Sequence, residues 1–328
     1  MKIKRLDKYD NLRGLGIFLI VLMHLDLLHI FTGFPKNLLF ATHLPLLYYV
    51  SGYFSKIGPD ESIKSFKRIL IPYLVFCIIV KIAQWFVLGY KLSFKLIFVE
   101  PSACLWFLIA LFIMKMMLPI FNRFKYPILA SIICALVMGF IHIDHTILGL
   151  TRCFAYFPIF LVGFYHKQTK NNITTQYRKI VNLFNKHYKI ISIVIVILFA
   201  IVCYKFQLRI FMFKKPYSGN LLYELIKRII VIGLEIGIVL VLDKFMTNRN
   251  CFLTKFGKNS MAIYLLHIYP MICLKKILPQ SLAGNIAVSL IITFGLAFII
   301  TYILSRDVVS KYLNKFTDGI YNIIAKPI

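Results

Sequence analysis

The chain has 328 residues, of which 60% are hydrophobic and only 16% charged, and its mean hydropathy is +0.79. Soluble domains carry about 25% charged residues, so this composition excludes a soluble enzyme, a disordered tail and a secreted disulfide scaffold. The formal charge of +27 does not indicate nucleic-acid binding, because no segment combines basic and aromatic residues in a polar background. An excess of Lys and Arg in an apolar chain is typical of loops at an anionic cytoplasmic membrane surface.

The hydrophobic runs predict an all-α, polytopic integral membrane protein of about ten transmembrane helices. One transmembrane domain is expected over 1–328, and no cleavage site follows the first run, so we expect that run to remain as a span. Of the 39 Lys and Arg, 24 lie in segments predicted on the side of the N-terminus, which places both termini in the cytoplasm. The tail, 305–328, is short and cytoplasmic. The predicted spans are 12–31, 37–55, 69–89, 103–121, 127–143, 146–165, 190–208, 221–243, 260–278 and 286–304.

The first span carries the largest set of polar residues. Arg13 and His24 are eleven residues apart, which on a helix returns them to within about 20° of one face, about 16 Å apart along the axis. Arg13 is therefore expected at the cytoplasmic mouth and His24 beyond mid-membrane, where an anionic carrier would place its phosphates and its reactive end. The alternative is that Arg13 anchors the span at the interface and His24 is hydrogen-bonded in the core.

Two residues from other spans are expected at the depth of His24. His43 and Arg152 each lie six residues from the outer start of their spans, and His24 lies seven residues from the outer end of its own. Packing alone does not explain two histidines and an arginine in one layer, because charged and polar groups are expensive inside a membrane. The sequence therefore predicts a shared polar site.

The remaining polar residues have more than one explanation. His267 either lines the same cavity from below or bonds to a backbone carbonyl, and Glu100 is either a base or a loop carboxylate. On the eighth span, Glu224 is spaced to pair with Lys227 and Arg228, which favours a structural role for this set and for Glu235.

No metal site is predicted from the sequence. His142, Asp144 and His145 resemble metal ligands, but they fall in a short outer turn, where solvation is the simpler explanation. The seven cysteines show no C-x-x-C or zinc spacing and are expected to be reduced core or lipid-facing residues. Motifs of metalloproteases, P-loop ATPases and G-x-S-x-G hydrolases are absent as well.

The DNLRG sequence at 10–14 followed by His24 resembles the R-x(10)-H signature of the acyltransferase-3 superfamily, membrane O-acyltransferases that modify sugars. Among its branches, the chain is most similar to the stand-alone, fucose 4-O-acetylase-like group. Tyr48 and Tyr49 stand where Phe is usual, and the seventh and eighth spans match no family motif. Further similar motifs, in the family's order, are HLP at 43–45, SGYF at 51–54, KRILIPY at 67–73, LWFL at 105–108, Arg152 with FP at 157–158 and Gly163, GKNS at 257–260 and YLLH at 264–267.

The resemblance implies transfer of an acetyl group from cytoplasmic acetyl-CoA to a sugar hydroxyl outside the membrane. Acetyl-CoA would be the acyl donor, and no cofactor is expected to be bound permanently. The acceptor would be a surface glycan or its lipid-linked precursor, with no nucleic-acid partner. The excess of Lys over Arg, with abundant Ile, Asn and Phe, fits an AT-rich bacterial genome and hence a bacterial cell membrane. The alternative is an exporter or flippase of a lipid-linked or surface polysaccharide, which would not depend on acetyl-CoA.

Specific roles follow from joining the resemblance to the predicted depths. His24 would be the general base on the acceptor hydroxyl or, alternatively, the acyl carrier. His43 would orient or assist it, and Arg152 would stabilise the oxyanion of the tetrahedral intermediate. Residues expected to hold or support the CoA phosphates are Arg13, Asp10, Lys67 and Arg68, and residues expected to line the cavity are Ser51, Glu100, Trp106 and His267.

Overall fold

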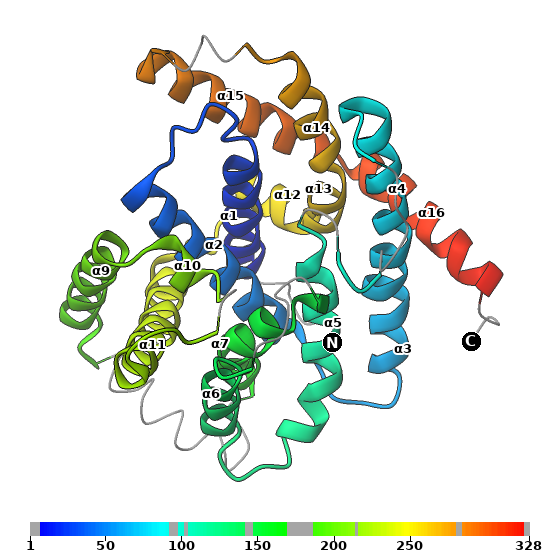
Figure 1. The fold of residues 1–328 in the computed structure, drawn as a ribbon. Coiled ribbons are helices and arrows are strands. Elements are labelled where there is room, and N and C mark those ends of the chain that lie inside the picture. Colours follow the sequence, from blue (N-terminus) through cyan, green and yellow to red (C-terminus); the bar gives the residue numbers. More distant parts are fainter. Residues whose placement is uncertain are drawn as a thin grey trace. The chain divides into compact units, whose positions relative to one another are not determined.

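The computed structural model describes residues 7–91, 98–101, 104–141, 147–168, 186–213, 216–279 and 284–324. Within these ranges every regular element is a helix, which confirms the predicted all-α class (Figure 1). Each predicted span overlaps at least one helix. The number of ten spans and the orientation of the termini stay predictions. The helical stretches that are long and apolar enough to cross a membrane are Glu61–Leu88, Ile147–Lys167, Tyr188–Lys205 and Ile286–Leu304.

The chain divides into two compact units. The first comprises Met1–Thr32, Ile63–Ile109 and Met246–Ile328, and the second comprises Gly33–Ser62 and Ala110–Phe245. Two helices, α3 (Glu61–Ser65) and α5 (Trp106–Phe121), each contain a boundary between the units. The other elements of the first unit are α1 (Asp7–His24), the π-helical η1 (Phe66–Leu70), α4 (Ile71–Leu88), α12 (Phe252–Lys258), α13 (Ser260–Leu266), α14 (Ile268–Ile277), α15 (Ile286–Leu304) and α16 (Asp307–Ile324). Those of the second are α2 (Gly33–Phe54), α6 (Pro127–Val137), the 3₁₀ turn η2 (Ile147–Gly149), α7 (Leu150–Lys167), α9 (Tyr188–Lys205), α10 (Leu208–Phe211) and α11 (Leu221–Phe245).

In the first unit, α1 packs closely against α12 because glycines bring the two backbones together (Figure 1). Gly14 lies against the backbone carbonyl of Leu253, and Gly257 lies against that of Asp10. A side chain at either glycine would overlap the opposite backbone, so only glycine permits this approach. The glycines of two family-like motifs therefore build one helix–helix contact.

A buried asparagine fixes the same contact with hydrogen bonds. The side-chain amide of Asn11 donates to the backbone carbonyls of Thr247, at 2.9 Å, and Arg249, at 3.0 Å. The hydroxyl of Thr254 donates to the side-chain carbonyl oxygen of Asn11. Asn11 is fully buried, and a buried amide is stable only when its donors and acceptor are paired. These bonds hold α1 in one position relative to the segment that leads into α12.

The second unit uses the same device between α2 and α7. Gly52 lies against the carbonyl of Phe160, and Gly163 lies against the carbonyl of Tyr49. Close backbone contact through small residues is common between membrane helices, where no water is available to drive apolar surfaces together. The second-span and sixth-span motifs thus form the helix pair at the centre of this unit.

The predicted tail, 305–328, contains a helix that the sequence reading did not identify. α16 begins at Asp307, and the side chain of Asn259 donates to the carbonyl of Ser305, at 2.8 Å, and to the carboxylate of Asp307, at 2.9 Å. Asn259 therefore fixes the start of α16 against the junction of α12 and α13. The tail contains no continuous apolar run because apolar and polar residues alternate around the helix, with Leu313 on the buried side and Lys315 on the exposed side.

Candidate active site

Helix α1 carries both residues of the R-x(10)-H pattern. It is continuous from Asp7 to His24, so Arg13 and His24 lie on one helix face, about 16 Å apart along the axis. Both side chains are partly exposed, whereas Asp10, one turn before Arg13, is fully buried. The pair therefore shares one helix face within the first unit, and its roles at the cytoplasmic mouth and in a reaction site stay predictions.

His24 is the last residue of α1, seven residues before the predicted end of the first span. The next buried carboxylate, Asp26, accepts hydrogen bonds from the backbone N–H groups of Ile30, at 2.7 Å, and Phe31, at 3.2 Å. An Asp side chain that accepts hydrogen bonds from nearby backbone N–H groups competes with continuation of the helix. The helix therefore stops, and His24 stands at a helix end instead of inside a longer span.

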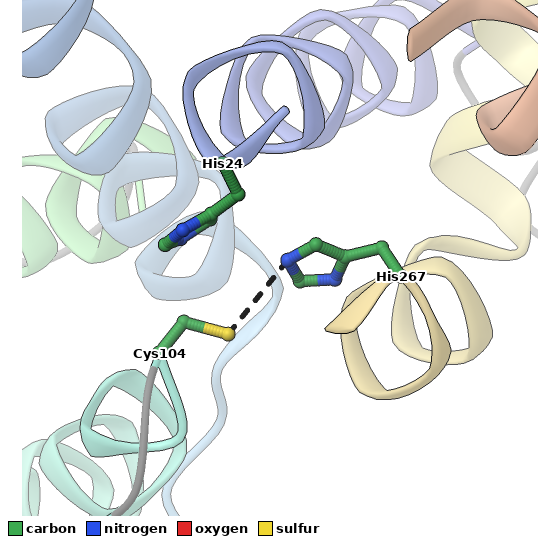
Figure 2. Close-up of side chains that lie close together, drawn as sticks. All are labelled: His24, Cys104 and His267. Atoms are coloured by element: carbon green, nitrogen blue, oxygen red, sulfur yellow. Dashed lines mark hydrogen bonds between the residues drawn. The ribbon is translucent and has the colours of Figure 1, made fainter. Parts of the chain in front are cut away.

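The ring of His24 meets the ring of His267. Their centroids are 5.3 Å apart and the rings are tilted by 43° (Figure 2). His267 is fully buried at the junction of α13 and α14, and its Nδ1 lies 3.0 Å from the carbonyl oxygen of Ile263. The bond to a backbone carbonyl, one of the two alternatives for His267, is therefore present, and the ring also lies against His24; its role in lining a cavity stays a prediction.

Cys104 completes the cluster from the turn that leads into α5. Its Sγ lies 3.8 Å from Nε2 of His267, and the thiol points between the two imidazoles (Figure 2). The residue is 5% exposed. A cysteine here was not singled out by the sequence, because its neighbours in the chain are apolar and its imidazole partners come from two distant segments. Its assignment as a plain core or lipid-facing residue misses this contact.

The backbone around Cys104 is held by Tyr264, one turn before His267. The hydroxyl of Tyr264 donates to the carbonyl oxygen of Cys104, and its ring packs on Phe107 with centroids 5.4 Å apart. The helix that presents His267 therefore also fixes the turn that presents Cys104. This arrangement fixes the position of the Cys104 thiol relative to the His267 imidazole.

The donor types in the cluster are also those that zinc accepts. One nitrogen of each histidine and the sulfur of Cys104 all lie within 4.8 Å of one another. Two ligands of one tetrahedral zinc ion lie about 3.3 to 3.6 Å apart, given the usual Zn–N and Zn–S distances. The 3.8 Å between Cys104 Sγ and Nε2 of His267 is within reach of a thiol–imidazole hydrogen bond and only slightly longer than this ligand spacing, so proton transfer and zinc binding are separated by experiment below.

Most of the residues expected to bind CoA phosphates or line the cavity also lie in the first unit. Lys67 and Arg68 lie on η1, a π-helical turn of a kind that often marks functional sites. The Nζ of Lys67 is 3.0 Å from the carboxylate of Asp318 on α16. Trp106 begins α5, two residues after Cys104, and Glu100 is exposed in the described stretch before it.

The second unit contains the other predicted site residues. His43 and Ser51 lie on α2, His43 buried and Ser51 partly exposed. Arg152 is buried on α7 and interacts electrostatically with Tyr48 and Tyr156. The predicted common layer of His24, His43 and Arg152 stays a prediction.

Helix α11 shows a buried acid whose role the sequence pattern did not indicate. Glu224 forms the expected ion pair with Lys227, while Arg228 donates to the carbonyl of Ala135 at 3.1 Å. Glu235 is fully buried, and among the described residues neither of its carboxylate oxygens has a hydrogen-bond partner. Its grouping with the structural ion pair is therefore not supported. The possible metal ligands at 142–145 lie outside the described residues.

Comparison with known families identifies the chain over almost its whole length. The family model Acyl_transf_3, an acyltransferase domain, matches residues 6–306. This range includes all three members of the His24, Cys104 and His267 cluster. No curated protein and no solved structure matches the chain.

Proposed function

Because the chain belongs to the acyltransferase-3 family and is a membrane acyltransferase, we propose that it moves an acetyl group from acetyl-CoA to a sugar hydroxyl. The acceptor would be a surface glycan of a bacterial cell, or its lipid-linked precursor, on the outer side of the plasma membrane. Because its motif pattern resembles the fucose 4-O-acetylase-like branch, we propose that the chain belongs to that branch. The observation that carries the proposal is the position of His24, at the end of the helix that bears Arg13 and against the ring of His267.

His24 is proposed as the general base. A partly exposed imidazole at a helix end can reach an acceptor hydroxyl, and removal of that proton makes the oxygen a competent nucleophile. His267 packs on His24 from a fully buried position, so it holds the ring of His24 on one side. Such positioning matters because a catalytic base must lie within hydrogen-bond reach of the proton that it removes.

Arg13 is proposed to bind the phosphates of CoA at the cytoplasmic end. Arg13 and His24 are about 16 Å apart along α1. The pantetheine arm would span this distance and bring the thioester to His24. Lys67 and Arg68 on η1 add positive charge in the same unit, and Asp10, one turn before Arg13 on α1, would help to position it. Guanidinium groups suit this task because they bind phosphate oxygens in a bidentate manner.

His43 and Arg152 keep the roles expected from the family resemblance. His43 would orient the acceptor, and Arg152 would stabilise the negative oxygen of the tetrahedral intermediate. A well-placed donor of this kind contributes about 3 kcal/mol to the transition state. Both residues are buried in the second unit, where water does not compete for their hydrogen bonds.

The proposal is tested with membranes from cells that do or do not express the protein, supplied with acetyl-CoA labelled in the acetyl group. Label that enters the polysaccharide or lipid-linked sugar fraction only when the protein is present supports the proposal and identifies the acceptor pool. If no label is transferred and surface polysaccharide is missing from the knockout, the protein is an exporter and the proposal is wrong.

A further inference from the structure

Cys104 and His267 form a nucleophile and base pair beside His24 (Figure 2). Cys104 and His267 are both buried, while the side chain of His24 is partly exposed, so His24 is the member of the cluster that reaches the surface. General base catalysis by His24 alone gives no task to a thiol at this place. A thiol that hydrogen-bonds to an imidazole is the arrangement of a cysteine that forms covalent intermediates.

The hydrogen bond of His267 to its own helix sets the direction of proton transfer. A carbonyl oxygen only accepts hydrogen bonds, so Nδ1 of His267, 3.0 Å from the Ile263 carbonyl oxygen, must carry the proton. The opposite nitrogen, Nε2, then holds a free electron pair and faces the sulfur of Cys104 at 3.8 Å. The thiol is therefore the donor, and the imidazole is positioned to take its proton.

We propose that Cys104 is a covalent acyl carrier, so that the transfer proceeds in two steps through a thioester on the protein. This inference rests on the proposed acetyltransferase function and assigns it a double-displacement mechanism. Thioester exchange between two thiols is nearly neutral in free energy, because the bond broken and the bond formed are of the same kind. The intermediate therefore retains the reactivity of the acetyl group for the second step.

In the first step, His267 takes the proton of the Cys104 thiol and the sulfur attacks the carbonyl carbon of acetyl-CoA. The tetrahedral intermediate collapses with loss of the CoA sulfur, which receives the proton from His267 and leaves as free CoA thiol. In the second step, His24 takes the proton of the acceptor hydroxyl and the oxygen attacks the Cys104 thioester. The carbon–sulfur bond breaks, the Cys104 sulfur recovers that proton, and the acetyl ester is released.

The two histidines thus serve different half-reactions. One nitrogen of each imidazole and the sulfur of Cys104 lie within 4.8 Å of one another, so both bases lie next to one sulfur, which is what a shared intermediate requires. Tyr264 fixes the Cys104 carbonyl from the same helix that presents His267, so one helix holds both the base and the backbone that carries the sulfur. Loss of His24 should block only the second step, whereas loss of Cys104 or His267 should block the first.

The test uses purified full-length protein in lipid nanodiscs with acetyl-labelled acetyl-CoA and no acceptor, followed by acid quench. Wild type should retain up to one acetyl group per chain, released by neutral hydroxylamine, as thioesters are. Cys104→Ser and Cys104→Ala should retain none, and His267→Ala should label about 100-fold more slowly. Cys273→Ser is the matched control, because Cys273 is an exposed cysteine on α14 of the same unit, and it should label as wild type does. His24→Ala should accumulate label and fail to pass it to the acceptor.

Three results would overturn the proposal while leaving the acetyltransferase function intact. Unlabelled wild-type protein that still acetylates the acceptor, or correctly folded Cys104→Ala that acetylates it as well as wild type, would each indicate direct transfer. Stoichiometric zinc in the purified wild type that is lost in Cys104→Ser would make the sulfur a metal ligand. If wild type neither retains label nor acetylates any membrane acceptor, the proposed function and this inference fail together.

Discussion

Replacement of Gly14 by alanine adds only one methyl group but should clearly destabilise the protein. The added Cβ would lie 2.8 Å from the carbonyl carbon of Leu253 and 3.1 Å from the backbone nitrogen of Gly257, and closer still to the Leu253 oxygen. Carbon atoms pack at about 3.5 to 4.0 Å, so α1 and α12 would have to separate by at least about 0.7 Å. Since every opposing atom belongs to a backbone, no side chain can rotate to make room.

We expect Gly14→Ala to lower the free energy of unfolding by about 1 to 3 kcal/mol, the usual range for overpacking. Gly295→Ala is the matched control, because Gly295 lies inside α15 of the same unit and no described atom lies within 4 Å of its added Cβ. Alanine favours helix over glycine by about 1 kcal/mol, so the control should be neutral or slightly stabilised. The two variants should therefore differ by at least about 1 kcal/mol, or about fivefold in the unfolding equilibrium constant.

The difference can be measured by titrating the purified protein from a mild detergent into sodium dodecyl sulfate and following the loss of helical structure by circular dichroism. Because α1 presents Arg13 and His24, Gly14→Ala should also reduce acetyl transfer where the protein is still folded. Equal stability of Gly14→Ala and Gly295→Ala would refute the claim that the glycine contact fixes α1.

Other substitutions separate structural contacts from catalytic ones. Asn11→Ala should lower the free energy of unfolding by about 2 to 3 kcal/mol. The bonds of the buried Asn11 amide to the carbonyls of Thr247 and Arg249 are lost, and the buried Thr254 hydroxyl loses its acceptor. Asn248→Ala loses one exposed bond from the backbone N–H of Lys8 and should change the free energy by less than about 0.5 kcal/mol, so similar losses in the same detergent titration would contradict this. Lys67→Ala should raise the KM for acetyl-CoA, because Lys67 is proposed to contact the CoA phosphates. It should change the free energy of unfolding by less than about 1 kcal/mol, since the ion pair of Lys67 with Asp318 is half exposed. An unchanged KM would show that Lys67 is not part of the CoA site. Tyr264→Phe removes the hydrogen bond to the Cys104 carbonyl, which is worth about 1.4 kcal/mol. It should therefore lower kcat about tenfold and leave the KM for acetyl-CoA unchanged. A wild-type kcat would show that the turn at Cys104 holds its position without Tyr264.

The helices were predictable because apolar runs are the strongest signal in a membrane chain. The run at 286–304 coincides with α15, and the run at 190–208 differs from α9 by a few residues. The end of α1 was not predictable from hydropathy, because Leu25, Leu27 and Leu28 continue the apolar pattern beyond His24. Only the hydrogen bonds of Asp26 to Ile30 and Phe31 show that the chain turns there.

The candidate site was predictable in part, and the limit is tertiary contact. The eleven-residue spacing of Arg13 and His24 is local, so helix geometry alone gave their relation. His267 was a candidate because it is a titratable residue in an apolar run, although only the structure brings it against His24. Cys104 carried no local signal, since a cysteine behaves as a small apolar residue in such a run. Its significance depends on residues 80 and 163 positions away.

The central claim is that His24 is the base of an acyltransferase reaction centre. Its most direct test is the rate of acetyl transfer from acetyl-CoA to the acceptor glycan by purified wild type, His24→Ala and His187→Ala, the last being an exposed histidine at the start of α9. The account predicts a loss of at least about 100-fold for His24→Ala and a wild-type rate for His187→Ala, with both variants folded. A His24→Ala protein that transfers acetyl groups at the wild-type rate would contradict it.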